Sequence, residues 1–515
     1  MKPTLEQEAI LKAVRETKSS LMINAGAGCG KTTTLEMIAR AIPPEQPALA
    51  VAFNVSTKKN MEKRFPDNFR VKTLNGLGHS AWGKAIGKRL GVEENKLGAI
   101  VKNVFKDAQF SGTAEQFAGV CKLVSSAMHA GLIPQRYAKN YKGLVEDREE
   151  VWQDIADEHF IDVGSSLIGF ARETLTISIQ QAFAGTINYD DQIYMSALFG
   201  GVFPRFPLVL VDEAQDLSPL NHIQVRRCAA DRLMVVGDQK QSIYAFRGAD
   251  HESIEKLRSL RSDWIDLPLM LTFRCPKVIV ERQQEHVPGF RAHESNAEGL
   301  YKNLLVTEKK DWSWETIQEL KHRPDAEVAI LCRNNAPLLS TAFRLIKQRV
   351  GCHMLGRDIG KNLIALSRKI MPLDDIPAED CFRLINEWRK KEISLAVANE
   401  KEHKISGITD RADCLVAVIE SGEVETAGKL RQALDDLFAR THGQVTLSTG
   451  HRAKGLEWDI IIHIDPWFIP SKQAQRAASQ GNSAQLKQEL NLKYVIETRS
   501  KHTLILANSE DFANV

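Results

Sequence analysis

The sequence predicts an α/β protein built on parallel β-sheets that helices cover. Six short, continuous apolar runs carry this prediction, because such runs are typical of strands buried on both faces of a parallel sheet. They cover residues 21–23, 208–211, 233–236, 328–331, 460–464 and 503–507. The runs end in polar or glycine-rich turns and fall into two groups, one within residues 1–266 and one within 267–515. Two α/β halves are therefore expected.

Two long stretches between these runs have the apolar spacing of helices. In residues 115–124 and again in 381–388, apolar residues recur at intervals of three and four, which is the period of a helix with one buried face. We expect a first core domain over 1–84 and 185–266 with a helical insertion at 85–184. A second core domain is expected over 267–356 and 441–515, with a smaller helical insertion at 357–440.

The composition is that of a globular protein. Of the 515 residues, 43% are hydrophobic and 26% are charged, which excludes collagen-like, disordered and disulfide-scaffold classes. The charges sum to only +3. This total does not by itself indicate a nucleic-acid partner, because a basic groove can be hidden in a nearly neutral molecule.

Membrane, secretory and metal-cluster classes are also disfavoured. No apolar run approaches the roughly 18 residues of a membrane span, and no apolar signal segment follows Met1. The eight cysteines include no C-x-x-C pair, which argues against a zinc site, an iron–sulfur cluster or a disulfide framework. Reduced thiols favour a cytoplasmic protein with no membrane partner.

A phosphate-binding loop follows the first apolar run. Residues 25–32 read Ala-Gly-Ala-Gly-Cys-Gly-Lys-Thr and open a helix, the pattern of a P-loop with Ala25 in place of its first glycine. Small residues let backbone N–H groups face a β-phosphate, and the helix N-terminus adds positive potential. Lys31 is expected to reach the β- and γ-phosphates, and the Thr32 hydroxyl to ligate Mg²⁺. The predicted nucleotide-binding residues are Ala25, Gly26, Ala27, Gly28, Cys29, Gly30, Lys31, Thr32 and Thr33.

Acidic residues end the apolar run at 208–211. Asp212 is expected at the carboxyl end of its strand, beside the P-loop, where it would hold Mg²⁺. Glu213 would accept a proton from the attacking water and orient it. Acidic residues also cap strands for structural reasons. Together with the P-loop, however, the pair predicts a site that hydrolyses a nucleoside triphosphate.

The order of further motifs resembles that of superfamily 1 DNA helicases of the UvrD/Rep type. In the first half, the Q motif, motifs Ia and Ib, the segment before motif II, motif II and motif III correspond to residues 4–10, 52–54, 72–79, 188–191, 212–216 and 235–249. In the second half, motifs IV, V and VI correspond to residues 271–276, 449–459 and 489–501. Asn491, where many relatives carry arginine, and the Ala-Gln of motif II resemble the F-box DNA helicase branch and its phage relatives. A cytoplasmic protein that a bacterium or a phage encodes is expected.

The resemblance implies a fold and a reaction. The fold would be two RecA-like P-loop core domains, each a parallel sheet with flanking helices and a helical insertion, the second insertion reduced. ATP and Mg²⁺ would be the cofactors. Phosphoryl transfer needs positive charge where negative charge develops, and the resemblance places Gln241, Arg274 and Arg499 at the γ-phosphate. The catalytic set implied is Lys31, Asp212, Glu213, Gln241, Arg274 and Arg499, with Thr32 and Asp212 as metal ligands.

Further residues would contact the rest of the nucleotide and the DNA strand. The resemblance implies that Gln7 reads adenine, that Phe273 stacks on it and that Glu457 contacts the ribose, although a core phenylalanine is the alternative for Phe273. Aromatic rings stack on bases of any sequence, for about 1–3 kcal/mol per base. The implied DNA-binding residues are Tyr244, Phe246 and Arg247 of motif III, with Phe53, Asn54, His79 and His451. Packing explains Phe53, His79, His451 and Trp82 nearly as well.

The implied function is an ATP-dependent helicase or translocase that moves 3′→5′ along single-stranded DNA. It would unwind duplex or displace bound protein in DNA repair, recombination or replication. Its partners would be single-stranded DNA, single-strand/duplex junctions and a protein such as a nuclease or repair factor. The short second insertion leaves an alternative open, a DNA-stimulated ATPase subunit of a repair or anti-phage defence complex that does not unwind alone. A plain nucleotide-binding switch is disfavoured, because it has no use for motifs III and V.

Overall fold

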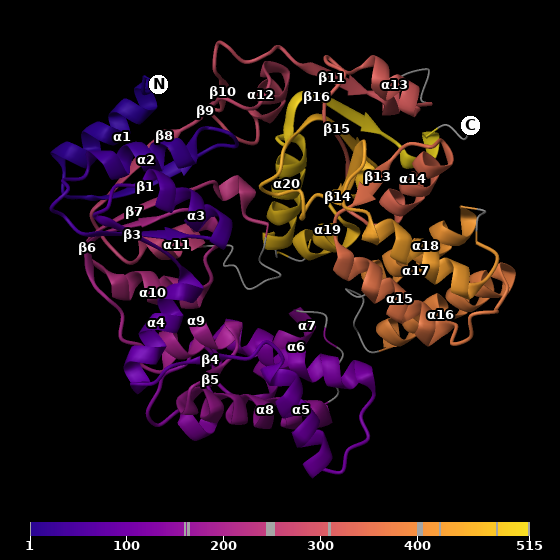
Figure 1. The fold of residues 1–515 in the computed structure, drawn as a ribbon, viewed down its shortest axis with the longest axis horizontal. Coiled ribbons are helices and arrows are strands. Elements are labelled where there is room, and N and C mark those ends of the chain that lie inside the picture. The colour runs from indigo at the N-terminus through magenta and orange to yellow at the C-terminus, as the bar shows by residue number, and fades with distance from the viewer. Residues whose placement is uncertain are drawn as a thin grey trace. The chain divides into compact units, whose positions relative to one another are not determined.

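The computed structural model describes residues 2–158, 161, 165–243, 253–306, 311–398, 405–421, 424–479, 481 and 483–512. It divides into two compact units, Met1–Ala25 with Gly30–Met270, and Gly26–Cys29 with Leu271–Val515. Each unit holds a six-stranded sheet (Figure 1), and every strand pair in both sheets is parallel. The prediction of an α/β fold with two parallel sheets is confirmed.

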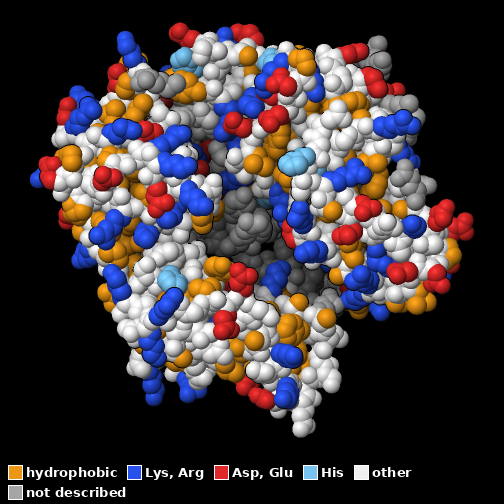
Figure 2. Space-filling model, viewed as in Figure 1, with side chains coloured by type: hydrophobic (Ala, Val, Ile, Leu, Met, Phe, Trp, Pro, Cys, Tyr) orange, Lys and Arg blue, Asp and Glu red, His pale blue; other side chains and the backbone are white. Residues whose placement is uncertain are grey.

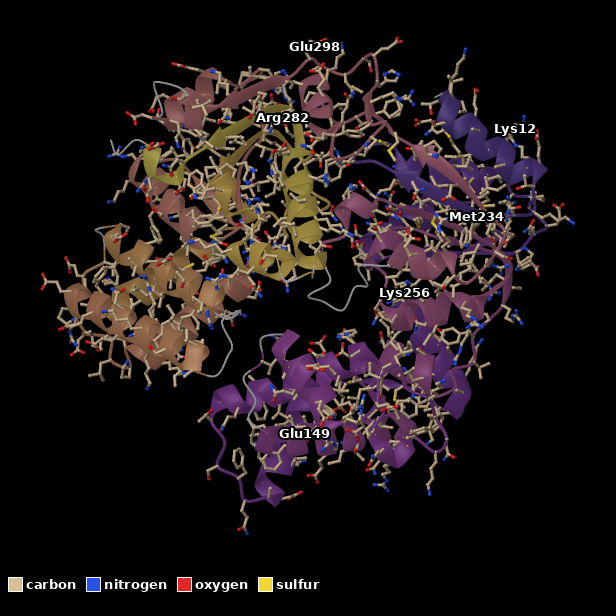
Figure 3. All side chains as sticks on the ribbon, turned by 180° about the vertical axis from the view of Figure 1, so that it is seen from behind. Lys12, Glu149, Met234, Lys256, Arg282 and Glu298 are labelled. Atoms are coloured by element: carbon tan, nitrogen blue, oxygen red, sulfur yellow. The ribbon has the colours of Figure 1, made fainter. Side chains whose placement is uncertain are left out.

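The sheet of the first unit has the strand order β3-β2-β6-β7-β1-β8. Its strands are β1 (Ser20–Ala25), β2 (Ala48–Ala52), β3 (Phe69–Thr73), β6 (Phe206–Val211), β7 (Ala229–Gly237) and β8 (Trp264–Leu269). Met234 of β7 is fully buried between Leu21 of β1 and Leu210 of β6, in the middle of the sheet (Figure 3). All strands run in one direction, so the carboxyl ends of β1 and β6 lie at the same edge.

Two groups of helices accompany this sheet. The first group is α1 (Leu5–Glu16), α2 (Lys31–Ala41), α3 (Val55–Arg64), α4 (Leu74–Ile86), α9 (Tyr189–Leu198), α10 (Pro219–Cys228) and α11 (Ser253–Arg258). The second comprises α5 (Lys96–Asp107), α6 (Ala114–Ala130), α7 (Glu149–Glu158) and α8 (Ser165–Ala184), with a strand pair β4 (Gly91–Val92) and β5 (Thr186–Ile187). In Figure 1, α4, α9 and α10 lie between the sheet and this second group. A shared apolar core joins both groups.

Two consecutive aspartates in α9 anchor the second group of helices. The Lys96 ammonium of α5 lies 2.6 Å from an Asp191 carboxylate oxygen, and both side chains are buried. Ser125 of α6 donates to Asp190 over 2.6 Å, and His129 Nε2 lies 3.2 Å from the same carboxylate. The segment before motif II therefore fixes the first turn of α9 against α5 and α6.

The sheet of the second unit has the order β11-β16-β15-β12-β14-β13. Its strands are β11 (Leu300–Asn303), β12 (Val328–Cys332), β13 (Cys352–Met354), β14 (Val445–Thr449), β15 (Trp458–Ile464) and β16 (Ser500–Ala507), and β9 (Leu271–Thr272) and β10 (Arg291–Ala292) form a separate pair. Helices α14 (Ala336–Lys347), α15 (Arg357–Ile370), α16 (Ala378–Ala398), α17 (Ile405–Glu420) and α18 (Ala427–Ala439) share one apolar core with the sheet. The remaining helices are α12 (Lys277–Gln283), α13 (Trp314–Glu319), α19 (Lys472–Ser479) and α20 (Ala484–Glu497).

The surface carries charges of both signs. Figure 2 shows Lys and Arg side chains interspersed with Asp and Glu over the visible face, in keeping with a formal net charge of +3. In the part of the chain that the structure describes, no helix has the length and apolar character needed to cross a bilayer.

Candidate functional site

The P-loop is a tight turn between β1 and α2. Gly28 and Gly30 have positive φ angles of +69° and +76°, a backbone conformation that glycine adopts without steric cost. A Cβ on Gly28 would also lie 2.5 Å from Arg274 Cβ. Gly30 is the N-cap of α2. Because Gly30 has no side chain, none of its own atoms competes with a bound anion for the free N–H groups of the first helical turn.

Lys31 points toward the carboxylates at the end of β6. Its Nζ lies 2.7 Å from Glu213 Oε2. Asp212, which precedes Glu213 in the sequence, is buried. Burial alone would lower the pKa of Lys31, but Glu213, Asp212 and Asp238 outweigh burial and raise that pKa. Burial, followed by repulsion from Glu213, raises the pKa of Asp212 to about 7. Lys31 is therefore surrounded by three carboxylates, those of Glu213, Asp212 and Asp238.

A chain of hydrogen bonds connects motif II to motif III. Gln215 Nε2 donates to Glu213 Oε2 over 2.6 Å, and Gln215 Oε1 accepts the Asp238 N–H over 3.0 Å. Gln241 Nε2 then donates to Asp238 Oδ2 over 2.6 Å. Glu213 has a positive φ of +50°, a conformation that non-glycine residues adopt only when their surroundings hold them there. Sequence reasoning assigned no role to Gln215 or Asp238, because their contact depends on the pairing of β6 with β7.

Gln7 is already engaged by neighbouring residues. Its Oε1 accepts the Thr4 N–H as part of a capping box, and its Nε2 donates to Thr34 Oγ1 over 3.1 Å. Thr34 in turn donates to the Gly30 carbonyl over 3.0 Å. Gln7 therefore connects α1 with the first turn of the P-loop helix, and the reading of adenine by its amide stays a prediction.

In the second unit, motif IV meets motif V. Arg274 Nε lies 2.5 Å from Glu457 Oε2. The Phe273 ring is 38% exposed and packs against His293 with ring centroids 4.8 Å apart. A ring this exposed does not fit the alternative of a core phenylalanine. The Phe273 N–H donates to the Gly28 carbonyl over 3.0 Å.

Motif VI holds a buried arginine and a buried tyrosine. Arg499 is 1% exposed, and its guanidinium donates to the Val495 and Leu456 carbonyls over 3.0 and 3.4 Å. Tyr494 Oη accepts the Ala27 N–H over 2.8 Å. The contact places a motif VI side chain on the backbone of the P-loop turn, and sequence reasoning gave Tyr494 no role.

The predicted DNA-contacting residues have different environments. Phe53 is 43% exposed, and Asn54 caps α3 by accepting the Thr57 N–H over 2.8 Å. His79 lies half-buried on α4, and His451 lies half-buried in motif V. Trp82 is 1% exposed within the core that joins the helices, so packing explains it. Tyr244, Phe246 and Arg247 lie outside the described residues.

Tyr189 is an exposed aromatic residue that sequence reasoning passed over. It opens α9, its side chain is 54% exposed, and its hydroxyl donates to Glu94 over 3.2 Å. Its backbone carbonyl accepts a hydrogen bond of 3.0 Å from Asn75 of motif Ib, on α4. The sequence shows an aromatic residue before two aspartates, but only the structure shows that its ring faces solvent beside motif Ib.

The donor set around Lys31 fits a magnesium–nucleotide group. Mg²⁺ prefers hard oxygen ligands and in nucleotide sites binds through one or two protein groups, phosphate oxygens and water. The Asp212 carboxylate and the Thr32 hydroxyl are ligands of this kind. Within the described ranges, no group of three or more His, Cys, Asp or Glu side chains is arranged to hold a metal ion.

Comparisons with known proteins match both halves of the chain. The UvrD/REP helicase N-terminal domain matches residues 6–260, and the UvrD-like helicase C-terminal domain matches residues 385–511. F-box DNA helicase protein 1 of Schizosaccharomyces pombe is 24% identical over 98% of this chain and 57% of its own length. ATP-dependent DNA helicase PcrA of Staphylococcus aureus is 25% identical over 67% of this chain and 50% of its own length. The chain thus spans about half the length of these curated relatives.

Proposed function

Because the chain belongs to the UvrD/Rep family of helicases, we propose that it is an ATP-dependent motor that moves along single-stranded DNA. ATP hydrolysis would be coupled to duplex unwinding or to displacement of bound protein, in DNA repair, recombination or replication. The observation that carries the proposal is the meeting of Lys31 with Glu213. It brings a P-loop and an acidic pair together at one edge of a parallel sheet.

The residues of the first unit would divide the work of hydrolysis. Lys31 would bind the β- and γ-phosphates, and Thr32 with Asp212 would hold Mg²⁺. When bound, Mg²⁺ neutralises charge on the phosphate oxygens. Glu213 would accept the proton of the attacking water, while Gln241 would contact the γ-phosphate. Binding of nucleotide would break the Lys31–Glu213 ion pair and free the carboxylate for this role.

The second unit would supply positive charge and contacts to the nucleoside. Arg274 and Arg499 would stabilise charge that develops on the transferred phosphoryl group. Phe273, exposed on one face, would stack on adenine, and Glu457 would contact the ribose. Gln7 would support the adenine site from α1.

Contacts to DNA would be made mainly by aromatic rings, because base stacking does not depend on sequence. Tyr244, Phe246 and Arg247 of motif III would form one contact. Phe53 and Asn54 of motif Ia, His79 of motif Ib and His451 of motif V would extend it. Tyr189, exposed beside motif Ib, joins the proposed set.

The proposal is tested by strand displacement with ATP and Mg²⁺ on duplexes that carry a 3′ or a 5′ single-stranded tail, with ATP turnover measured in the same samples. Displacement from the 3′ tail alone is expected for a 3′→5′ helicase. Displacement from the 5′ tail alone would reverse the proposed polarity. Turnover stimulated by DNA without displacement would favour the ATPase-subunit alternative, and turnover indifferent to DNA would overturn the motor.

A further inference from the structure

A second concave site lies in the first unit, away from the P-loop. It is a pocket of about 600 Å³ lined by Gly201, Val202, Phe203, Arg205, Ile223, Arg226 and Arg227. These residues come from the loop before β6 and from α10. We call this set the arginine pocket. Its lining combines three guanidinium groups with three apolar side chains and contains no carboxylate.

The arginines of this pocket lack acidic partners. Among the residues that the structure describes, no carboxylate forms an ion pair with Arg205, Arg226 or Arg227. Burial lowers the pKa of Arg227, and no described carboxylate offsets that effect. Arg205 and Arg226 are exposed and Arg227 is half-buried, so their guanidinium groups are accessible to an anion from solution. The pocket therefore presents positive charge that none of the residues lining it neutralises, and a ligand with carboxylates could pair with it.

One of these arginines is held in place. Arg227 Nη1 donates to the Ser196 carbonyl over 2.9 Å, and its guanidinium carbon lies 5.8 Å from the centre of the Phe203 ring. Val202, at the rim, is 54% exposed. A fixed guanidinium loses little freedom on binding an anion, and the apolar surface next to it offers a place for an apolar side chain.

The pocket lies at the opposite edge of the sheet from the proposed ATP site. Residues 201–205 lead into the amino end of β6, and α10 ends at Cys228, just before β7 begins at Ala229. Lys31 and Asp212 follow the carboxyl ends of β1 and β6. Because all strands of the sheet are parallel, the amino and carboxyl ends form opposite edges. A ligand in the arginine pocket would leave the proposed ATP site accessible.

We propose that the arginine pocket binds an acidic peptide segment of a partner protein, with carboxylates on the arginines and an apolar side chain against Phe203, Val202 and Ile223. Arginine clusters recognise acidic motifs through paired hydrogen bonds. A nucleic-acid backbone is the less suitable occupant, since its phosphates need a continuous track and would not use the apolar lining. The proposal goes beyond the motor function and does not depend on it.

The test measures fluorescence anisotropy of a labelled eight-residue peptide in which Phe and Leu are flanked by Asp, added to the full-length chain. Saturable binding that weakens with salt is expected. Arg205→Glu and Arg226→Glu should each weaken binding at least about tenfold. Val202→Asp should also weaken binding, because it removes apolar surface that would contact the apolar side chain of the peptide and adds a carboxylate that repels the Asp residues. Arg15→Glu, at an exposed site on α1, is the matched charge control and should leave binding unchanged.

Two further probes separate the sources of binding. A peptide with Asn in place of every Asp should not bind, and ATP turnover of the arginine variants should match that of the unaltered chain. The proposal fails if the acidic peptide does not saturate the unaltered chain. It also fails if Arg226→Glu and Arg15→Glu weaken binding equally. Loss of affinity for a dT oligonucleotide or a DNA duplex in the Arg226→Glu variant, with peptide binding intact, would assign the pocket to nucleic acid instead.

Discussion

At the scale of single residues, Gln215 links the proposed general base to motif III. Its amide donates to Glu213 and accepts from the Asp238 backbone, so it fixes the carboxylate of a residue whose backbone is itself strained. We expect Gln215→Ala to lower kcat for DNA-stimulated ATP hydrolysis by about 10- to 100-fold, the range for a lost hydrogen bond to a charged group. KM for ATP should change little, because Lys31 and the P-loop stay intact.

The Glu213→Gln variant and the split between kcat and KM distinguish positioning of the base from support of nucleotide binding. Glu213→Gln sets the size of the loss when the base itself is removed, about 100-fold or more, and Gln215→Ala should not exceed it. If Gln215→Ala raised KM for ATP and left kcat unchanged, Gln215 would support nucleotide binding rather than position the base.

Tyr189 can be separated into its ring and its hydroxyl. Loss of a stacked base costs about 1–3 kcal/mol, so Tyr189→Ala should weaken binding of a dT oligonucleotide by about 5- to 150-fold. Tyr189→Phe keeps the ring and loses only the contact with Glu94, and it should bind like the unaltered chain. Equal losses in both variants, measured by anisotropy, would show that the hydroxyl matters and the ring does not.

At the scale of elements, the apolar runs predicted six interior strands of the two sheets and missed two others, β2 and β14. All six predicted runs lie inside strands. The edge strands β3 and β8 escaped detection, because an edge strand alternates buried with exposed residues, as β3 does. The central strand β2 reads Ala-Leu-Ala-Val-Ala, and alanine favours helices, so this run did not stand out as a strand.

The buried pair Lys96–Asp191 makes the attachment of α5 to α9 testable. Removing one partner of a buried ion pair leaves the other charge uncompensated and costs about 3–5 kcal/mol. We expect Lys96→Met to lower the free energy of unfolding, measured by urea denaturation, by about this amount. The double variant Lys96→Met with Asp191→Asn should recover part of the loss, because it removes both charges. A double variant less stable than the single one would show that the pair contributes through hydrogen bonds to its neighbours.

The neighbouring pair His129–Asp190 makes this attachment sensitive to pH. Burial would lower the pKa of His129, but the hydrogen bond and charge of Asp190 outweigh burial and raise it above 6.5. Its contribution to stability is therefore complete below about pH 6.5 and is lost as pH rises through the folded-state pKa. His129→Gln should lower Tm at pH 6 and have a smaller effect at pH 9. A loss of Tm that is equal at both pH values would mean that packing, not charge, makes the contribution.

At the scale of the whole molecule, the sequence predicts motifs made of neighbouring residues but not contacts between residues that are far apart in the chain. The P-loop and the Asp212–Glu213 pair are each contiguous in sequence, so their chemistry follows from a few neighbouring residues. The contact of Ala27 with Tyr494 joins residues that lie 467 positions apart, and the engagement of Gln7 with Thr34 depends on how α1 packs on α2. Contacts of this kind require the fold.

Arg499 tests whether hydrolysis depends on both units. Its guanidinium is buried and held by backbone carbonyls, so its position is set before any nucleotide binds. An arginine at the γ-phosphate contributes about 10³–10⁵ to the rate of phosphoryl transfer. We expect Arg499→Ala to lose turnover on this scale while a fluorescent ATP analogue still binds.

Arg499→Lys keeps a cation but not the fixed fork of donors, so its turnover should stay far below that of the unaltered chain. Folding of both variants is checked by their unfolding midpoints. Lost nucleotide binding with kcat preserved would place Arg499 in ground-state recognition of the nucleotide instead of in stabilisation of the transition state.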